Sequence, residues 1–135
     1  MELLVADAAG IVKEMSSILP QVDKDAMLEN QDLGLSLAET FKEALKISSD
    51  GWVDDDLAFV QAWGFELNEI KIPIFLYQGS LDLMVPFSHG QWLAQNLPKE
   101  HLTEHLIEGQ GHVSIWLGYM KGMLKELSSI KEQPL

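Results

Sequence analysis

The chain of 135 residues contains no cysteine. This absence excludes disulfide bonds, thiolate metal ligands and thiol catalysis, and it fits a reducing, cytoplasmic setting, which we expect for the protein. Basic residues are also scarce, because Lys and Arg number 9 against 21 Asp and Glu, for a net charge of −12. Such a charge repels nucleic acids and anionic bilayers, so neither is an expected partner.

Long hydrophobic runs are missing as well. No apolar stretch approaches the roughly 20 residues of a membrane-spanning helix, and Glu2 stands where a signal peptide would carry a basic residue. We therefore expect a protein without membrane segments. What the sequence does contain is a hydrophobic fraction of 47% beside a charged fraction of 22%, as is typical of a soluble globular domain with a packed core.

The first half of the chain shows helical periodicity. Apolar residues recur at helical spacing, and the predicted helices cover residues 2–19, 23–30, 35–48 and 53–64. Pro20 is expected to end the first helix and Asp23 to cap the second. Gly51 is expected to occupy a turn with positive φ, and Gly64 to end the fourth helix.

The second half changes to an alternating α/β pattern. Short apolar runs at 72–78 and 101–108 predict strands, and Pro86 begins a helix predicted for 86–98. A final amphipathic helix is predicted for 112–130. The fold class is therefore α/β, with a helical segment at 1–66 followed by a strand-helix-strand-helix unit with a short parallel sheet at 67–135.

A candidate catalytic residue follows each of the two predicted strands. Asp82 lies in the loop after the first strand, and His112 lies after the second, preceded by Gly109 and Gly111, which allow a tight bend. Carboxyl ends of neighbouring parallel strands meet at one edge of a sheet. A carboxylate beside an imidazole fixes its tautomer and stabilises its protonated form. Taken singly, however, each residue is also explained as a turn former or a helix cap.

The same residues stand in recognisable motifs. The strand followed by G-x-x-D-x-x-V-P, from Gly79 to Pro86, and the stretch G-x-G-H, from Gly109 to His112, resemble the carboxyl-terminal segment of the α/β-hydrolases. This resemblance implies a partial α/β-hydrolase fold, with Asp82 as the triad acid and His112 as the base of ester or amide hydrolysis. The helices at 1–66 resemble the cap or lid of such enzymes, with the proline-iminopeptidase-like branch as the nearest pattern.

The chain departs from that family in its nucleophile. Family members carry a G-x-S-x-G elbow between a strand and a helix. The nearest string here is Gly34 to Ala38, which contains Ser36 and lies in a polar, helical context, so a helix start is the better interpretation. The isolated chain is expected to be inactive, whether it is a piece of a longer hydrolase or a natural truncation. The alternative is a non-catalytic interaction module derived from a hydrolase.

No cofactor or metal site is expected. His101 and His105 are four residues apart but fall in a predicted strand without a third ligand. As partners we expect either the missing amino-terminal hydrolase half or a second copy, because a two-stranded sheet is marginal and its open edge favours pairing. In the complete enzyme the substrate would be a small ester or amide.

Overall fold

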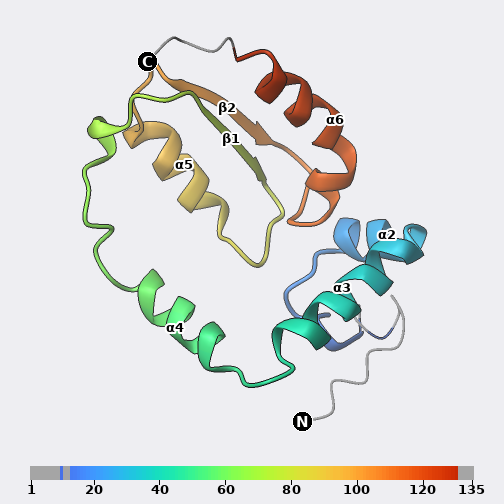
Figure 1. Ribbon diagram of the computed structural model, residues 1–135. Coiled ribbons are helices and arrows are strands. Elements are labelled where there is room, and N and C mark those ends of the chain that lie inside the picture. Colours follow the sequence, from blue (N-terminus) through green and yellow to red (C-terminus); the bar gives the residue numbers. More distant parts are fainter. Residues whose placement is uncertain (1–9, 11–12, 131–135) are drawn as a thin grey trace.

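The computed structural model describes residue 10 and residues 13–130, and it has a mixed α/β architecture (Figure 1). Strands β1 (Ile74–Gly79) and β2 (Leu102–Ile107) pair in parallel. Ile74 lies opposite Leu102 at the start of the pair, and Gly79 lies opposite Ile107 at its end. Both strands and their parallel pairing were predicted from the sequence. The carboxyl ends of the two strands therefore lie side by side.

Two helices pack on this sheet. Helix α5 (Phe87–Asn96) contacts both strands, and α6 (Ser114–Ser128) contacts β1 (Figure 1). Pro86 occupies the N-cap position of α5, one residue before the predicted first turn. Its fixed φ suits that position, and its missing N–H costs no helical hydrogen bond.

The described part of the first half is mostly helical, as predicted, with shifted boundaries. Helix α2 (Gln21–Glu29) follows Pro20 directly, and α3 (Gln31–Ala44) follows it. Asp23 does not cap α2 as expected, since the helix begins two residues earlier and this side chain is fully buried. The helix predicted for 2–19 lies largely outside the described residues.

Helix α4 (Asp50–Phe59) begins earlier than predicted. Gly51, expected in a turn with positive φ, lies in its first turn without one. The helix ends at Phe59, and Gly64 adopts a φ of 76° farther on, before the short 3₁₀ helix η1 (Leu67–Glu69). In Figure 1, α4 lies apart from the sheet, and all of its residues are exposed.

The most buried hydrophobic cluster joins the two halves of the chain. Leu19 and Met27 are each 1% exposed, and Met84 and Val113 pack against them from the loops that follow β1 and β2. Helix α2 also packs against α6. The helical segment is therefore fixed to the loops at the carboxyl ends of the strands. Over the described residues, none of the helices is both long and apolar enough to cross a membrane.

Candidate active site

The loops after β1 and β2 are bonded to each other. The N–H of Leu81 donates to the carbonyl of Gln110 at 2.8 Å, and the N–H of Gly109 donates to Ser80 Oγ at 2.9 Å. Gly79 makes this approach possible, because a Cβ there would overlap the Gln110 carbonyl. Gly109 adopts a φ of 78°, a conformation that strongly favours glycine. The two glycine-containing loops thus form one unit.

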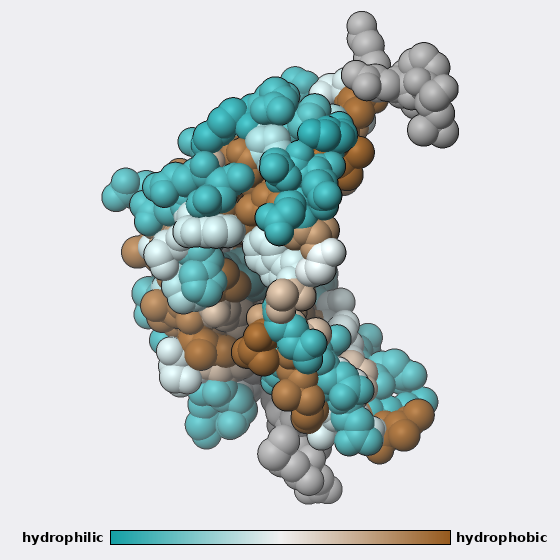
Figure 2. All heavy atoms as spheres, turned by 90° about the vertical axis from the view of Figure 1, so that its left-hand side faces the viewer, coloured by the Kyte–Doolittle hydropathy of each residue, from teal (hydrophilic) through white to brown (hydrophobic). Residues whose placement is uncertain are grey.

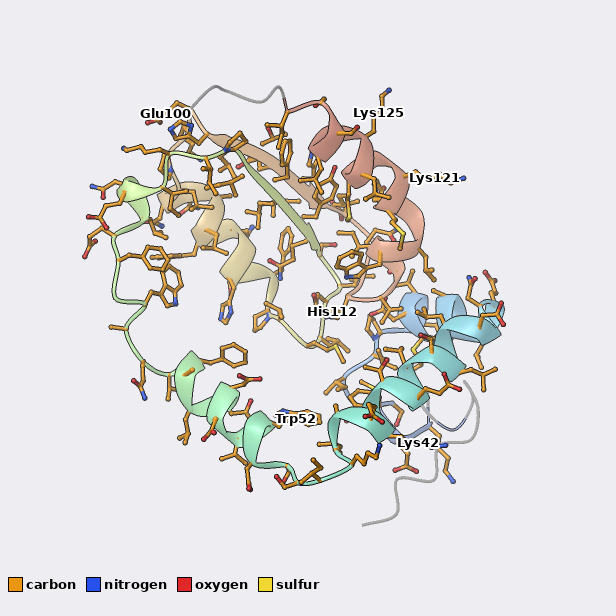
Figure 3. All side chains as sticks on the ribbon, viewed as in Figure 1. Lys42, Trp52, Glu100, His112, Lys121 and Lys125 are labelled. Atoms are coloured by element: carbon orange, nitrogen blue, oxygen red, sulfur yellow. The ribbon has the colours of Figure 1, made fainter. Side chains whose placement is uncertain are left out.

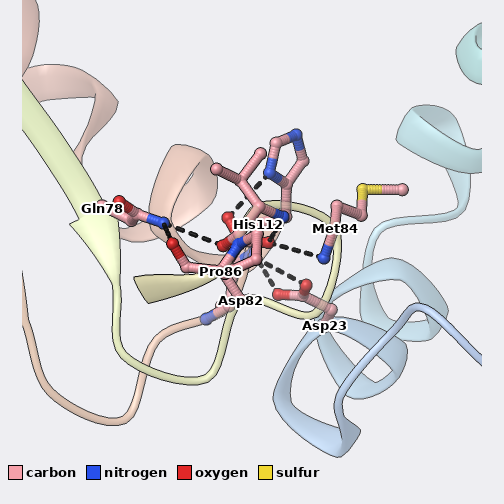
Figure 4. A network of polar contacts seen from close by, with 9 residues as sticks. Asp23, Gln78, Asp82, Met84, Pro86 and His112 are labelled. Carbon is pink, nitrogen blue, oxygen red and sulfur yellow. Dashed lines mark hydrogen bonds and ion pairs between the residues drawn. The ribbon is translucent and has the colours of Figure 1, made fainter. Parts of the chain in front are cut away.

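This unit brings Asp82 and His112 together. Asp82 Oδ2 lies 2.9 Å from His112 Nδ1 (Figure 4). The Asp82 side chain is only 5% exposed, whereas that of His112 is 41% exposed. The carboxylate is thus shielded from water while the imidazole remains accessible. Figure 3 shows His112 at the carboxyl ends of the strands, on the side away from Lys121 and Lys125.

The second carboxylate oxygen of Asp82 has a different function. Oδ1 accepts hydrogen bonds from the backbone N–H groups of Met84 and Val85, both at 2.8 Å. Asp82 is therefore a turn former, as one interpretation of the sequence held, and also the partner of His112. With one oxygen fixed by the backbone, the other is held in a defined direction toward the imidazole.

Gln78, at the end of β1, supports the same loop. Its side-chain amide is buried and donates to the carbonyls of Val85 and Pro86, at 2.9 and 3.1 Å (Figure 4). A Cβ at Gly90 of α5 would overlap the Gln78 amide oxygen. Gly90 therefore allows α5 to approach the strand closely enough for Gln78 to reach the loop.

Asp23 of α2 reaches the site from the other half of the chain. Its carboxylate accepts the backbone N–H of His112 through Oδ2 and that of Ser114 through Oδ1, both at 2.8 Å. Sequence reasoning assigned Asp23 only to its own helix. One sequence feature could have indicated a distant partner for α6. Val113, which precedes this helix, has no side-chain oxygen that could cap it. An uncapped helix start requires an acceptor from elsewhere.

Three serines considered as nucleophiles have other surroundings. Ser114 Oγ accepts the N–H of Gly111, Ser80 Oγ accepts that of Gly109, and Ser36 lies in the middle of α3. None of the hydrogen bonds formed by residues 13–130 involves His112 Nε2. Ser36 thus occupies a helix rather than a strand-to-helix elbow, but it lies inside α3 and not at the helix start that its sequence context favoured.

The histidines considered as metal ligands have other surroundings. His105 Nε2 lies 3.0 Å from Glu126 Oε1, and its ring stacks on Tyr77. The backbone carbonyl of His101 accepts a hydrogen bond from the N–H of Ile74 at the start of β1. In the described part of the chain, no three His, Asp or Glu side chains converge as a metal would require.

The arrangement at the strand ends can orient an imidazole and accept or deliver a proton at its accessible nitrogen. Comparison with protein-family models, curated protein sequences and solved structures finds no match to the chain. The assignment of a function to this site therefore depends on its geometry and on the motifs that form it.

Proposed function

We propose that the chain is the carboxyl-terminal portion of an α/β-hydrolase and supplies the acid and base of a Ser-Asp-His triad for ester or amide hydrolysis. The observation that carries this proposal is the 2.9 Å contact between Asp82 Oδ2 and His112 Nδ1, at the carboxyl ends of adjacent parallel strands. In a triad the aspartate bonds Nδ1, which leaves Nε2 to take the proton of the nucleophile.

Each residue then has a defined role. Asp82 holds the imidazole in the tautomer that carries a proton on Nδ1. His112 removes the hydroxyl proton of a serine through Nε2 and later delivers it to the leaving group. The serine and the oxyanion-hole donors would come from a segment other than residues 13–130. Without these groups, which supply much of the rate enhancement, the isolated chain is expected to be inactive.

The test begins with the coding sequence before Met1. An apolar strand followed by G-x-S-x-G in that reading frame supports the proposal. The extended protein should then hydrolyse p-nitrophenyl esters, and His112→Ala should reduce kcat by roughly 10⁶-fold. The chain alone should hydrolyse the ester at nearly the same rate as its His112→Ala variant. Any difference between the two rates should be no larger than the background hydrolysis by an exposed imidazole. Turnover by the chain alone that depends on Ser36 contradicts the proposal.

A second candidate function is that of a non-catalytic assembly module, and a specific surface favours it. An apolar groove of about 550 Å³ lies between β1 and α6, with Pro73, Phe75, Trp116, Met120, Leu124 and Leu127 among its lining residues. Within the described sheet β1 has one free edge. Since Ile74 and Ser80 donate toward β2, the alternating backbone groups of Phe75 and Tyr77 face that edge.

An open strand edge beside an apolar groove favours pairing with another chain. Hydrophobic side chains are also exposed on α4 and after it, including Trp52, Leu57, Phe59 and Trp63. Figure 2 shows hydrophobic side chains among hydrophilic ones on the face viewed there. We propose a homodimer for the chain by itself, and pairing of the same edge with the rest of the hydrolase in an extended protein. Sedimentation of the chain distinguishes a dimer from a monomer.

A further inference from the structure

We propose that Asp23 is a positioning residue of the acid–base site, because its buried carboxylate fixes the backbone of His112 and makes α2 part of that site. The function of His112 in this inference rests on the proposed hydrolase function, whereas the contacts of Asp23 do not. The imidazole is then held from two directions, by Asp82 through its ring and by Asp23 through its backbone.

The contacts are specific to a carboxylate. Oδ2 accepts the His112 N–H and Oδ1 accepts the Ser114 N–H, each at 2.8 Å (Figure 4). Asp23 is 0% exposed, and its carboxylate partners among the described residues are these two backbone groups. A buried carboxylate is costly unless it is hydrogen-bonded, so the two N–H groups and the carboxylate depend on one another.

The position of these N–H groups explains the preference for a negative charge. They lie at the start of α6, where the helix leaves its first N–H groups without internal partners and carries a partial positive charge. Val113, at the N-cap, offers no side-chain acceptor. Asp23 performs from α2 the capping that the local sequence does not provide.

Gly111 and the hydrophobic cluster provide an independent observation. A Cβ at Gly111 would overlap both carboxylate oxygens of Asp23, so the glycine immediately before His112 makes room for this side chain. Around the carboxylate, Leu19 and Met27 pack with Met84 and Val113. Met84 lies two residues after Asp82 and Val113 directly follows His112, so both site loops are packed against the segment that carries Asp23.

The experiment uses the whole 135-residue chain and needs no substrate. In Asp23→Asn the side chain keeps its size but offers one acceptor oxygen, and its NH₂ group opposes the second N–H. NMR would follow amide exchange at His112 and Ser114 and the Nδ1–H proton of His112. Asp25→Asn is the matched control, because Asp25 is an exposed acid on the same helix, and its side-chain partner among the described residues is Gln21.

We expect exchange at His112 and Ser114 to accelerate by roughly tenfold or more in Asp23→Asn, the effect of one lost hydrogen bond of ordinary strength. The Nδ1–H resonance should weaken or disappear, and Asp25→Asn should match the wild type. If Asp23→Asn lowers the melting temperature but leaves the Nδ1–H resonance of His112 unchanged, Asp23 is merely structural and the proposal is wrong.

A second pair of variants tests the same contact from Gly111, and one of them keeps Asp23 in place. Gly111→Ala should disturb His112 in the wild type, where the new methyl group meets the carboxylate, and should be tolerated in Asp23→Ala, where that space is free. Equal effects of Gly111→Ala in both backgrounds contradict the proposal. These measurements follow the surroundings of His112 and not the hydrolysis of an ester. A negative ester assay therefore contradicts the proposed hydrolase function but not the role of Asp23, and unchanged NMR signals contradict the role of Asp23 but not the hydrolase function.

Discussion

Tyr77 of β1 and His105 of β2 are register partners across the sheet, and their rings stack with centroids 4.2 Å apart. Glu126 of α6 joins both of them, since Tyr77 donates its hydroxyl to Oε2 at 2.7 Å and His105 Nε2 lies 3.0 Å from Oε1. This cluster ties α6 to both strands. Because α6 begins two residues after His112, the cluster helps to fix the helix on which the candidate site depends.

The cluster predicts a pH dependence of stability. Partial burial and the Glu126 carboxylate raise the pKa of Tyr77 from 10.0 to about 12. A raised pKa in the folded state means that the phenol stabilises the fold fully below pH 10.0, and that this contribution is lost as the pH rises toward 12. Below that window, Tyr77→Phe should reduce the free energy of unfolding by about 1 kcal/mol.

Denaturant unfolding of both proteins across this window measures the effect. The difference between wild type and Tyr77→Phe should shrink as the pH rises, and Glu126→Gln should weaken the pH dependence because it removes the neighbouring negative charge. A difference that stays constant up to the highest pH would show that Tyr77 and Glu126 are not coupled.

Asp82→Asn should change the tautomer of His112. If the amide oxygen keeps the hydrogen bonds to the N–H groups of Met84 and Val85, the NH₂ group faces His112 Nδ1. Nδ1 must then accept a hydrogen bond, and the ring proton moves to Nε2. Nitrogen-15 chemical shifts of the imidazole should report this exchange, and an unchanged tautomer would count against the contact.

Asp82→Ala is the companion variant. It removes the acceptor for both backbone N–H groups, so the free energy of unfolding should fall by about 1–3 kcal/mol. Amide exchange at Met84 and Val85 should accelerate. Asp82→Asn should lose less stability than Asp82→Ala, since the amide can retain the turn, and equal losses would show that Oδ1 does not organise the loop.

Gly90→Ala should destabilise the protein although alanine is the better helix former. The new methyl group would overlap the Gln78 amide oxygen, and displacing that amide breaks its two hydrogen bonds to Val85 and Pro86. We expect a net loss of about 1–2 kcal/mol, against a propensity gain of up to about 1 kcal/mol. Thermal or denaturant unfolding measures it.

Gly122→Ala is the matched control in α6, because a Cβ there meets no atom within 4 Å. It should stabilise the protein by about 0.5–1 kcal/mol. In a Gln78→Ala background, Gly90→Ala should also become neutral or stabilising. A destabilising effect of similar size in that background would exclude the Gln78 contact as its cause.

Leu124→Glu should prevent self-association of the chain if the groove between β1 and α6 is its dimer interface. Leu124 lines the groove and is 59% exposed, so a charge there opposes burial without disturbing the core. Lys121→Glu is the control, since Lys121 points outward from α6 in Figure 3. Analytical ultracentrifugation should give a monomer for Leu124→Glu and a dimer for the control. A wild-type monomer contradicts the dimer proposal.

The strands and the Asp82–His112 contact were predictable because their signals are local or follow from topology. An apolar run ending at Gly79 defines a strand, and the crossover to β2 makes the two strand ends neighbours. Asp82 and His112 follow those ends. Their adjacency therefore needs no knowledge of the remaining packing.

Asp23 and Gly51 show what local patterns do not contain. Asp23 is a residue type that commonly caps helices, but the residues that its carboxylate bonds are 89 and 91 positions away in sequence. Gly51 follows a run of polar residues that is typical of a turn, yet α4 already begins at Asp50. The stacking of Trp52 on Phe41 accompanies that earlier start. For Asp23, tertiary contacts decide the outcome.

The bond from Asp23 to His112 also has a consequence for the order of folding. It joins residues 89 positions apart, and closing so large a loop costs chain entropy that only the completed packing of α2 against α6 can offset. We therefore expect the β1–α5–β2 crossover unit to assemble first, with the imidazole acquiring its final orientation in a later kinetic phase. Refolding monitored at His112 should lag behind refolding monitored at the strands.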